Sequence, residues 1–292
     1  MAAGQTGADT PFRLGRDLPI NRLGLGTIRL SANGLTGPAR DPETGRAVLR
    51  RAVELGADLI DTADFYRSSD NSVRALPLVR EALHSYPSNL VIATKIGPTF
   101  PPEGGYRQAA ADELRRLVEN DLESLGLSRL DLVYLRAGEP MAPTDETVGE
   151  RFEVLAKLRE EGLIRHLGVS NVTTAQIDEA RAIAPVAAVQ NYFNVVNRSQ
   201  GTAVVDYCTA NNIAFFPFGP LGMGGRDDLN TEPVKKVAAR HNATVYQIAI
   251  AWLLARSPVV LPIPGTGSLA HLEENMAARS IVLTLDDLTK LG

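Results

Sequence analysis

The sequence predicts an α/β fold, a closed (β/α)8 TIM barrel with a short N-terminal β-hairpin. Eight short apolar runs alternate with longer amphipathic segments along the 292 residues. The runs are almost continuously apolar, which is typical of parallel strands that are buried on both faces. Alternating strands and helices predict parallel pairing with right-handed crossovers, and eight repeats favour a closed barrel over an open sheet. A barrel of this kind takes about 250 residues, so one domain is expected rather than the two that length alone suggests.

The predicted elements follow in a regular order. A hairpin over 12–20, with Gly15 at its turn, comes first and plugs one end of the barrel. Three segments between strands carry apolar residues at helical spacing and end in glycine, a common helix C-terminus; they cover 42–56, 109–126 and 147–162. Residues 1–11 are expected to be a disordered lead-in, and 12–292 a single barrel domain. The eight expected strands cover 23–28, 58–63, 90–95, 131–136, 166–171, 187–192, 213–218 and 259–264.

Composition excludes several classes of function. With 30 basic and 34 acidic residues the net charge is −4, without the basic stripe that duplex nucleic acid requires. No apolar run reaches the roughly 18 residues that span a membrane, and the first residues do not read as a secretory signal. The single cysteine, Cys208, forms no intrachain disulfide, so a reducing, cytoplasmic location is expected. The four histidines lack metal-site spacing, so no metal is expected, and the oligomeric state is left open.

Polar residues end strand after strand in the predicted barrel. Barrel enzymes build their sites at the carboxyl ends of the strands, and burying such groups without a purpose is costly. The sequence therefore predicts a site at this end of the barrel. Its candidate residues are Asp61, Lys95, Arg136, Ser170, Asn171 and Gln190.

Seven motifs in a fixed order make the prediction more specific. DTADFY contains Asp61 and Tyr66, VIATK ends in Lys95, and DLVYLR ends in Arg136; IRHLGVSN, AAVQNYFN, FPFGPLG and LPIPGTGSLAHLEEN follow. With these motifs the sequence resembles the aldo-keto reductase superfamily, over essentially the whole chain after residue 12. The resemblance implies reduction of an aldehyde or ketone to an alcohol by hydride transfer from a nicotinamide cofactor.

The resemblance implies that Tyr66 is the general acid. A free phenol has a pKa of about 10 and is a poor proton donor near neutrality. We expect Lys95, placed against the phenol oxygen, to favour the tyrosinate and lower that pKa. Asp61 would hold the Lys95 ammonium in place and keep it charged, so the three side chains would titrate as one coupled unit.

Arg136 stands where the family has a catalytic histidine. Arginine stays charged and offers a fixed fork of donors, so Arg136 is expected to orient and polarise the substrate oxygen rather than shuttle a proton. The alternative is that it turns away to pair with Glu139 at the rim. Some pyridoxal reductases of the superfamily carry Arg here, so the resemblance suggests an aromatic aldehyde, with pyridoxal reduced to pyridoxine.

The resemblance also implies a cofactor site, with NADP(H) favoured over NAD(H). Ser170, Asn171 and Gln190 match the residues that hold the nicotinamide carboxamide, and Phe218 matches the aromatic that stacks on its ring. Many relatives have Arg or Lys where Gly265 and Gly267 stand, which leaves His271 and Arg226 as basic candidates for the phosphate end. The remaining cofactor candidates are Gly26, Thr27, Gly219, Leu221, Gly265, Thr266, Ser268, Glu274 and Asn275.

Other functions stay open at this point. The carbonyl substrate could instead be a sugar or a polyketide-type biosynthetic intermediate. A barrel aldolase would use Lys95 as a Schiff base. A nicotinamide-binding regulatory subunit would bind the cofactor with little turnover, and the replaced histidine keeps that alternative open.

Overall fold

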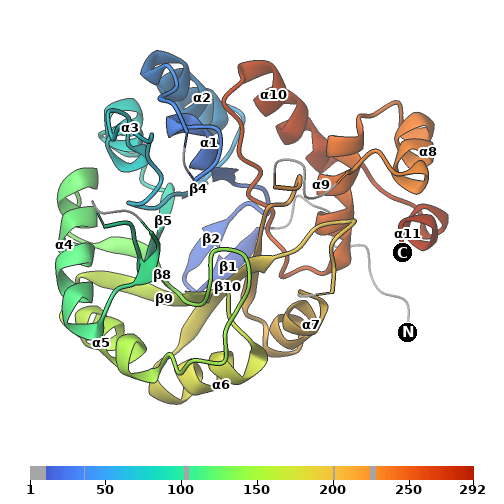
Figure 1. Cartoon of the computed structure of the whole chain (residues 1–292). Coiled ribbons are helices and arrows are strands. Elements are labelled where there is room, and N and C mark those ends of the chain that lie inside the picture. Colours follow the sequence, from blue (N-terminus) through green and yellow to red (C-terminus); the bar gives the residue numbers. More distant parts are fainter. Residues whose placement is uncertain (1–10, 36, 102–104, 200, 224–227) are drawn as a thin grey trace.

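A curled parallel sheet surrounded by helices forms the body of the molecule (Figure 1). The computed structural model describes residues 11–35, 37–101, 105–199, 201–223 and 228–292. Within these ranges, seven parallel strands pair in the order β11-β10-β9-β8-β5-β4-β3. Their bounds are β3 (Leu25–Gly26), β4 (Leu59–Asp61), β5 (Val91–Ile96), β8 (Leu130–Arg136), β9 (Ile164–Ser170), β10 (Val186–Tyr192) and β11 (Ala214–Phe218).

The eighth predicted strand, over 259–264, closes the ring through isolated bridges and not as a regular strand. Phe215 of β11 exchanges two backbone hydrogen bonds with residues 259–261, of 2.7 and 2.8 Å, and Gly26 of β3 donates to the Pro264 carbonyl at 3.3 Å. Only isolated parallel bridges result, because Pro262 and Pro264 have no N–H to donate to a ladder. The fold is thus the predicted (β/α)8 type, with a seam between β11 and β3.

A buried arginine supports this seam. Arg22 is 3% exposed, and its Nη2 donates to the carbonyls of Leu254, Ser257 and Val260 at 2.5, 2.8 and 3.3 Å. These carbonyls end helix α9 (Val245–Arg256) and begin the closing segment. Burial lowers the pKa of Arg22 to about 10.

Helices cover the outer face of the sheet, and the three predicted ones are confirmed with small shifts. Each of these helices is followed within two residues by a glycine with a positive φ, Gly56 at 91°, Gly126 at 66° and Gly162 at 87°, as the predicted C-termini require. The helix expected over 109–126 begins with a 3-10 turn over Ala111–Glu113. The helices are α1 (Ile28–Ser31), α2 (Pro42–Glu54), α3 (Ala75–Leu83), α4 (Leu114–Leu125), α5 (Gly149–Glu160), α6 (Thr174–Ile183), α7 (Thr202–Asn211), α8 (Glu232–His241), α9, α10 (Leu269–Ala277) and α11 (Leu285–Leu291), with a second 3-10 turn over Ala278–Ser280.

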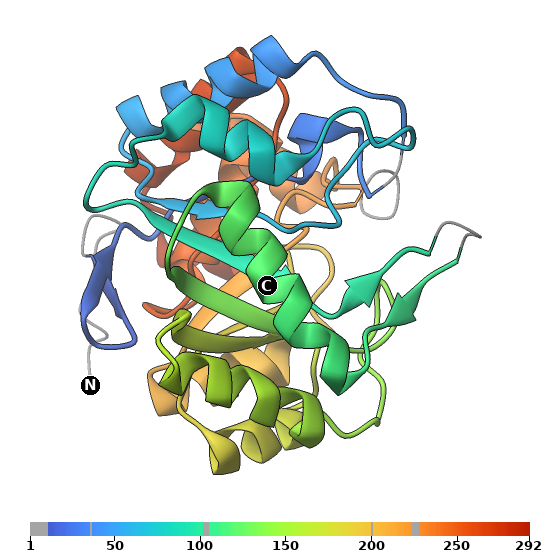
Figure 2. The same ribbon diagram turned by 90° about the vertical axis from the view of Figure 1, so that its left-hand side faces the viewer.

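Two hairpins mark the two ends of the barrel (Figure 2). The predicted N-terminal hairpin is confirmed as β1 (Phe12–Leu14) and β2 (Leu18–Ile20), and its fully buried Leu14 and Ile20 pack against the apolar interior of the barrel. The other hairpin, β6 (Pro98–Thr99) and β7 (Arg107–Gln108), follows β5 directly and lies at the carboxyl ends of the strands. One end of the barrel is therefore plugged, and the other remains available for a site.

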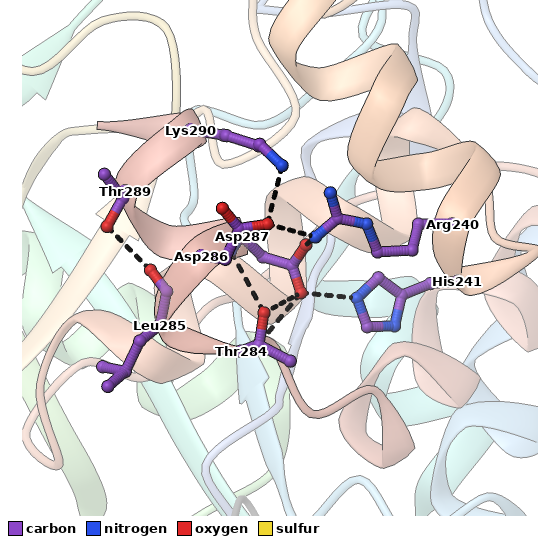
Figure 3. A network of polar contacts seen from close by, with 8 residues as sticks. All are labelled: Arg240, His241, Thr284, Leu285, Asp286, Asp287, Thr289 and Lys290. Carbon is purple, nitrogen blue, oxygen red and sulfur yellow. Dashed lines mark hydrogen bonds and ion pairs between the residues drawn. The ribbon is translucent and has the colours of Figure 1, made fainter.

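The C-terminal helix α11 is fixed to α8 by a polar network (Figure 3). The Asp287 side chain is fully buried, and its carboxylate lies 2.8 Å from His241 Nε2 and 2.7 Å from the Thr284 hydroxyl. Arg240 bridges Asp287 and Asp286. Burial alone would raise the pKa of Asp287, but its bonds to His241, Thr284 and Arg240 hold it below the ordinary value. Within the described ranges, no helix has the length and apolar character to cross a membrane.

Candidate active site

A cavity of about 550 Å³ opens at the carboxyl ends of the strands. It extends from the ends of β4, β8 and β11 past the end of β3 to helix α10. Most of the predicted site residues line it, which brings together segments from almost the whole length of the chain. Those lining it are Gly26, Thr27, Asp61, Tyr66, Arg136, Gln190, Phe218, Gly219, Leu221, Gly265, Thr266, His271, Glu274 and Asn275.

A buried ion pair lies at the base of this cavity. Lys95, from β5, is 1% exposed, and its Nζ lies 2.5 Å from Oδ1 of Asp61, the last residue of β4. The ammonium also donates to the Thr62 carbonyl at 3.0 Å. Gln190 Nε2 donates to the second Asp61 oxygen at 2.7 Å, so both carboxylate oxygens accept a hydrogen bond. With two contacts to oxygen, the ammonium is held in a fixed position.

Tyr66 lies next to this ion pair. The residue is 8% exposed, and Lys95 Nζ lies 4.9 Å from the centroid of its ring. Phe65 packs edge-on against the ring with centroids 5.1 Å apart. The turn after β4 and the start of α3 fix the backbone of Tyr66, through hydrogen bonds to Ala63 and from Ala75. The structure therefore brings Asp61, Lys95 and Tyr66 together, but among the described residues Lys95 donates to Asp61 and Thr62 and forms no hydrogen bond with the phenol oxygen against which it was expected to lie.

Arg136 lies on the cavity wall at the end of β8. Its Nη1 donates to Ser170 Oγ at 3.2 Å and its Nη2 to the Pro140 carbonyl at 2.5 Å. The guanidinium carbon lies 4.9 Å from the centre of the Phe218 ring. Burial lowers the pKa of Arg136, an effect that the nearby Tyr66 and Asp61 partly oppose. In the described part of the chain Arg136 forms no ion pair, so the rim pairing with Glu139 is not observed.

The three residues predicted to hold the nicotinamide carboxamide, Ser170, Asn171 and Gln190, differ in what their side chains contact. Asn171 has a positive φ of 59°, and its Nδ2 lies 2.8 Å from each of three carbonyls in the loop after β8, those of Ala137, Glu139 and Ala142. Its amide therefore braces that loop, outside the cavity lining. The Ser170 hydroxyl accepts from Arg136, and Gln190 is the member of the trio that lines the cavity.

The far end of the cavity is formed by the turn over 264–268 and by α10. Ser268 caps the helix by accepting from the His271 N–H at 3.4 Å, and it does not line the cavity itself. Glu274 accepts a hydrogen bond of 2.5 Å from the Thr244 hydroxyl. Arg226, the other basic candidate, lies outside the described residues.

Several apolar lining residues were not predicted from the sequence, and all but Phe65 lie outside the seven motifs. They come from loops that follow the strands, where no periodicity marks a buried side chain. Only Phe65 had a nearby signal, because it precedes Tyr66 within DTADFY. These residues are Leu35, Phe65, Met141, Met223 and Leu229.

Comparison with known proteins gives a consistent result. The model of the Aldo/keto reductase family matches residues 22–291. The chain is 41% identical over 275 residues to pyridoxine 4-dehydrogenase of Escherichia coli (strain K12), covering 93% of this chain and 94% of that protein. It is 30% identical to probable aldo-keto reductase 1 of Glycine max, covering 96% of this chain and 87% of that protein. An aldo/keto reductase of Klebsiella pneumoniae, solved in complex with NADP and acetate, superposes with a TM-score of 0.78 at 27% identity, covering 97% and 94% of the two chains.

Proposed function

Because the chain belongs to the aldo/keto reductase family, we propose that it reduces a small aldehyde or ketone to an alcohol with NADP(H), and that pyridoxal is such a substrate. The family makes the protein an oxidoreductase. One observation carries the proposed chemistry: the buried Lys95–Asp61 pair lies directly against the Tyr66 ring in the cavity. The Klebsiella relative with bound NADP supports the cofactor, and the Escherichia coli relative supports the substrate.

The cavity offers polar groups that fit a nicotinamide. Thr27 Oγ1 is buried without a hydrogen-bond partner within the described residues, and Gln190 Oε1 has near it only the buried Tyr134 hydroxyl, outside normal hydrogen-bond geometry; the side chains of Thr27 and Gln190 both line the cavity. An unpaired buried acceptor is costly, and a carboxamide N–H would satisfy it. We assign Gln190, Thr27 and the Phe218 ring to the nicotinamide end. When bound there, the cofactor supplies the hydride.

Tyr66 supplies the proton in the proposed reaction. A carbonyl oxygen gains negative charge as its carbon is reduced, so it needs a proton or a donor beside it. Tyr66 lines the cavity, and the positive charge of Lys95, 4.9 Å from the centre of its ring, would stabilise the negative charge left after proton transfer. Asp61 holds that ammonium, and Gln190 in turn holds Asp61. The contact with Asp61 and Thr62 also argues against a Schiff base, since both bonds would have to break to free the amine.

Arg136 would select the substrate. Its guanidinium presents fixed donors at the cavity wall, and the neighbouring wall is aromatic and apolar, with Phe65, Phe218 and Met141. A planar aromatic aldehyde with an oxygen beside the carbonyl, as in pyridoxal, would place that oxygen against the guanidinium. This supports pyridoxal over an aliphatic sugar.

The proposal is tested by substituting the proton donor. We expect Tyr66→Phe to lower kcat for pyridoxal by roughly 10²- to 10⁴-fold, the usual contribution of a general acid. The dissociation constant for NADPH should stay unchanged. A panel of carbonyls assayed with NADPH and NADH in parallel gives both values. Tyr86→Phe, whose hydroxyl bonds to the Leu125 carbonyl away from the cavity, is the matched control.

Two outcomes would contradict the proposal. Turnover in Tyr66→Phe equal to that of the unmodified protein would remove Tyr66 from the mechanism. Tight NADPH binding by the unmodified protein without reduction of any carbonyl would favour the regulatory-subunit alternative.

We also propose that residues 12–292 form one barrel domain that works in the cytoplasm. Cys208, the single cysteine, is fully buried on α7, and burial raises its pKa to about 12. A thiol of this kind needs no oxidising compartment. Limited proteolysis tests the domain: a stable fragment shorter than the barrel would contradict it, and cell fractionation tests the location.

A further inference from the structure

An arginine from a distant segment contacts the turn at the far end of the cavity, without lining the cavity itself. Arg40 precedes α2, yet its Nη2 donates to the carbonyl of Gly267, 227 positions along the chain, at 3.2 Å. Gly267 lies in the turn whose neighbours Gly265, Thr266 and His271 line the cavity. The Arg40 backbone is held by a 3.1 Å hydrogen bond to the Ser31 carbonyl. The position of this cation is therefore set by the fold.

Gly267 and Arg40 fit each other closely. A Cβ at position 267 would lie 2.4 Å from Arg40 Nη2 and 2.6 Å from its Cζ. Because φ of Gly267 is outside the left-handed region, the backbone would accept another residue. A larger residue here would instead have to displace the guanidinium, the flexible end of the Arg40 side chain, from its present position. The turn over 264–268 thus contains no basic residue, and the absence of a side chain at Gly267 leaves space for the guanidinium of Arg40.

Among the described residues Arg40 forms no ion pair, and the carboxylate of the adjacent Asp41 caps α2 instead. Among these residues the partners of the Arg40 side chain are Asn33 Oδ1 and the Gly267 carbonyl, which are both neutral. Two arginines of the adjacent helix α2 behave differently: Arg46 pairs with two glutamates, and so does Arg51. A half-buried guanidinium without a carboxylate is well suited to bind an anion.

We propose that Arg40 binds the 2′-phosphate of the NADP(H) adenosine and so sets the preference for NADP(H) over NAD(H). This inference rests on the proposed function. A dinucleotide with its nicotinamide beside Tyr66 and Gln190 has to extend its adenosine toward Thr266 and α10, where the cavity ends. The 2′-phosphate is the group that distinguishes the two cofactors, and a guanidinium binds a phosphate in a bidentate manner. Glu274 at the same end would repel the phosphate, which makes a nearby cation necessary.

The test compares ligands that differ only in this phosphate. Calorimetry on the apoprotein gives dissociation constants for NADP and NAD, and for adenosine 2′,5′-bisphosphate and adenosine 5′-monophosphate. We expect Arg40→Gln to weaken binding of NADP and of the bisphosphate by roughly 10- to 100-fold, the value of a charge-assisted hydrogen bond. Binding of NAD and of the monophosphate should be unaffected.

Three further variants separate recognition from folding. Arg40→Lys keeps the positive charge and should keep part of the preference for NADP. If Arg40 only braces Asn33 against Gly267, its substitution should instead weaken the binding of all four ligands equally. Gly267→Ala displaces the guanidinium while Arg40 is retained, and should reproduce the loss for NADP. Arg50→Gln is the matched control, because Arg50 lies on α2 and contacts the Ala82 carbonyl instead.

The outcomes distinguish the two proposals. If Arg40→Gln reduces carbonyls normally and keeps the NADP preference, the assignment of Arg40 is overturned while the proposed function stands. If the unmodified protein reduces no carbonyl but binds the bisphosphate through Arg40, the proposed reaction fails and the assignment stands. Equal loss for all four ligands would also overturn the assignment.

Discussion

Replacing Asp61 by Asn removes the negative charge from the base of the cavity and keeps the shape of the side chain. The carboxylate accepts from Lys95 at 2.5 Å and from Gln190 at 2.7 Å, one donor on each oxygen. An asparagine has one acceptor oxygen, so one of these donors would face an N–H₂ group. The Lys95 ammonium, 1% exposed, would also lose its counter-charge.

The expected loss of stability follows from that burial. Removing one partner of a buried ion pair costs about 3–5 kcal/mol, against about 1 kcal/mol or less for an exposed pair. This corresponds to a fall in Tm of roughly 5–8 °C for a protein of this size. Urea unfolding followed by circular dichroism, together with calorimetry, measures both quantities for Asp61→Asn.

The double variant Asp61→Asn, Lys95→Met is the control. It removes both charges, so it should be more stable than Asp61→Asn alone, because no buried charge is left without a partner. A loss below about 1 kcal/mol in Asp61→Asn would show that water reaches the ion pair. A double variant less stable than the single one would equally refute the reasoning.

Three further predictions concern Arg136, Cys208 and Asp287. Arg136→His should introduce a dependence of kcat on pH between about 6 and 8, where histidine titrates and arginine does not; a pH profile identical to that of the unmodified protein would show that Arg136 does not touch the substrate. Cys208, whose pKa is raised to about 12 by burial, should react with Ellman's reagent only after unfolding, and rapid reaction of the native protein would contradict this. The pKa of Asp287 is lower in the folded protein than in the unfolded chain, where it is about 4. Its contribution to the free energy of unfolding is therefore complete above that unfolded pKa and is lost as the pH falls toward the folded pKa. Asp287→Asn should therefore lower the free energy of unfolding at pH 7 by about 1–3 kcal/mol and reduce its fall in acid, as urea titrations at several pH values will show.

Most of the barrel could be predicted because its strands are buried on both faces. The predicted strands that end at Arg136, Tyr192 and Phe218 correspond to β8, β10 and β11. Each observed strand begins within one residue of its predicted start. The segment over 259–264 was predicted as a strand but forms only isolated bridges. Its apolar character predicts that it is buried, but not that it lacks the backbone N–H groups that a ladder needs. Pro262 and Pro264 are visible in the sequence, but their effect depends on which neighbour their nitrogens face.

The site was predictable where a side chain ends a strand, and less so where a loop decides its direction. Asp61 and Lys95 meet because their strands are neighbours in the barrel. The amide of Asn171 points to three carbonyls of the loop over 137–142, a loop conformation that no motif encodes. Arg40 reaches Gly267 only through the folded chain, so no local pattern could connect them.

The seam of the barrel connects ligand binding with the integrity of the whole molecule. Around most of the ring, neighbouring strands share continuous ladders, but at the seam Gly26 and Gly265 are joined by a single bridge. Both of these residues also line the cavity, so a dinucleotide bound there as proposed would contact both edges of this weakly joined seam. A cofactor bound at this place would favour the closed ring, so the free energy of unfolding should rise with cofactor concentration.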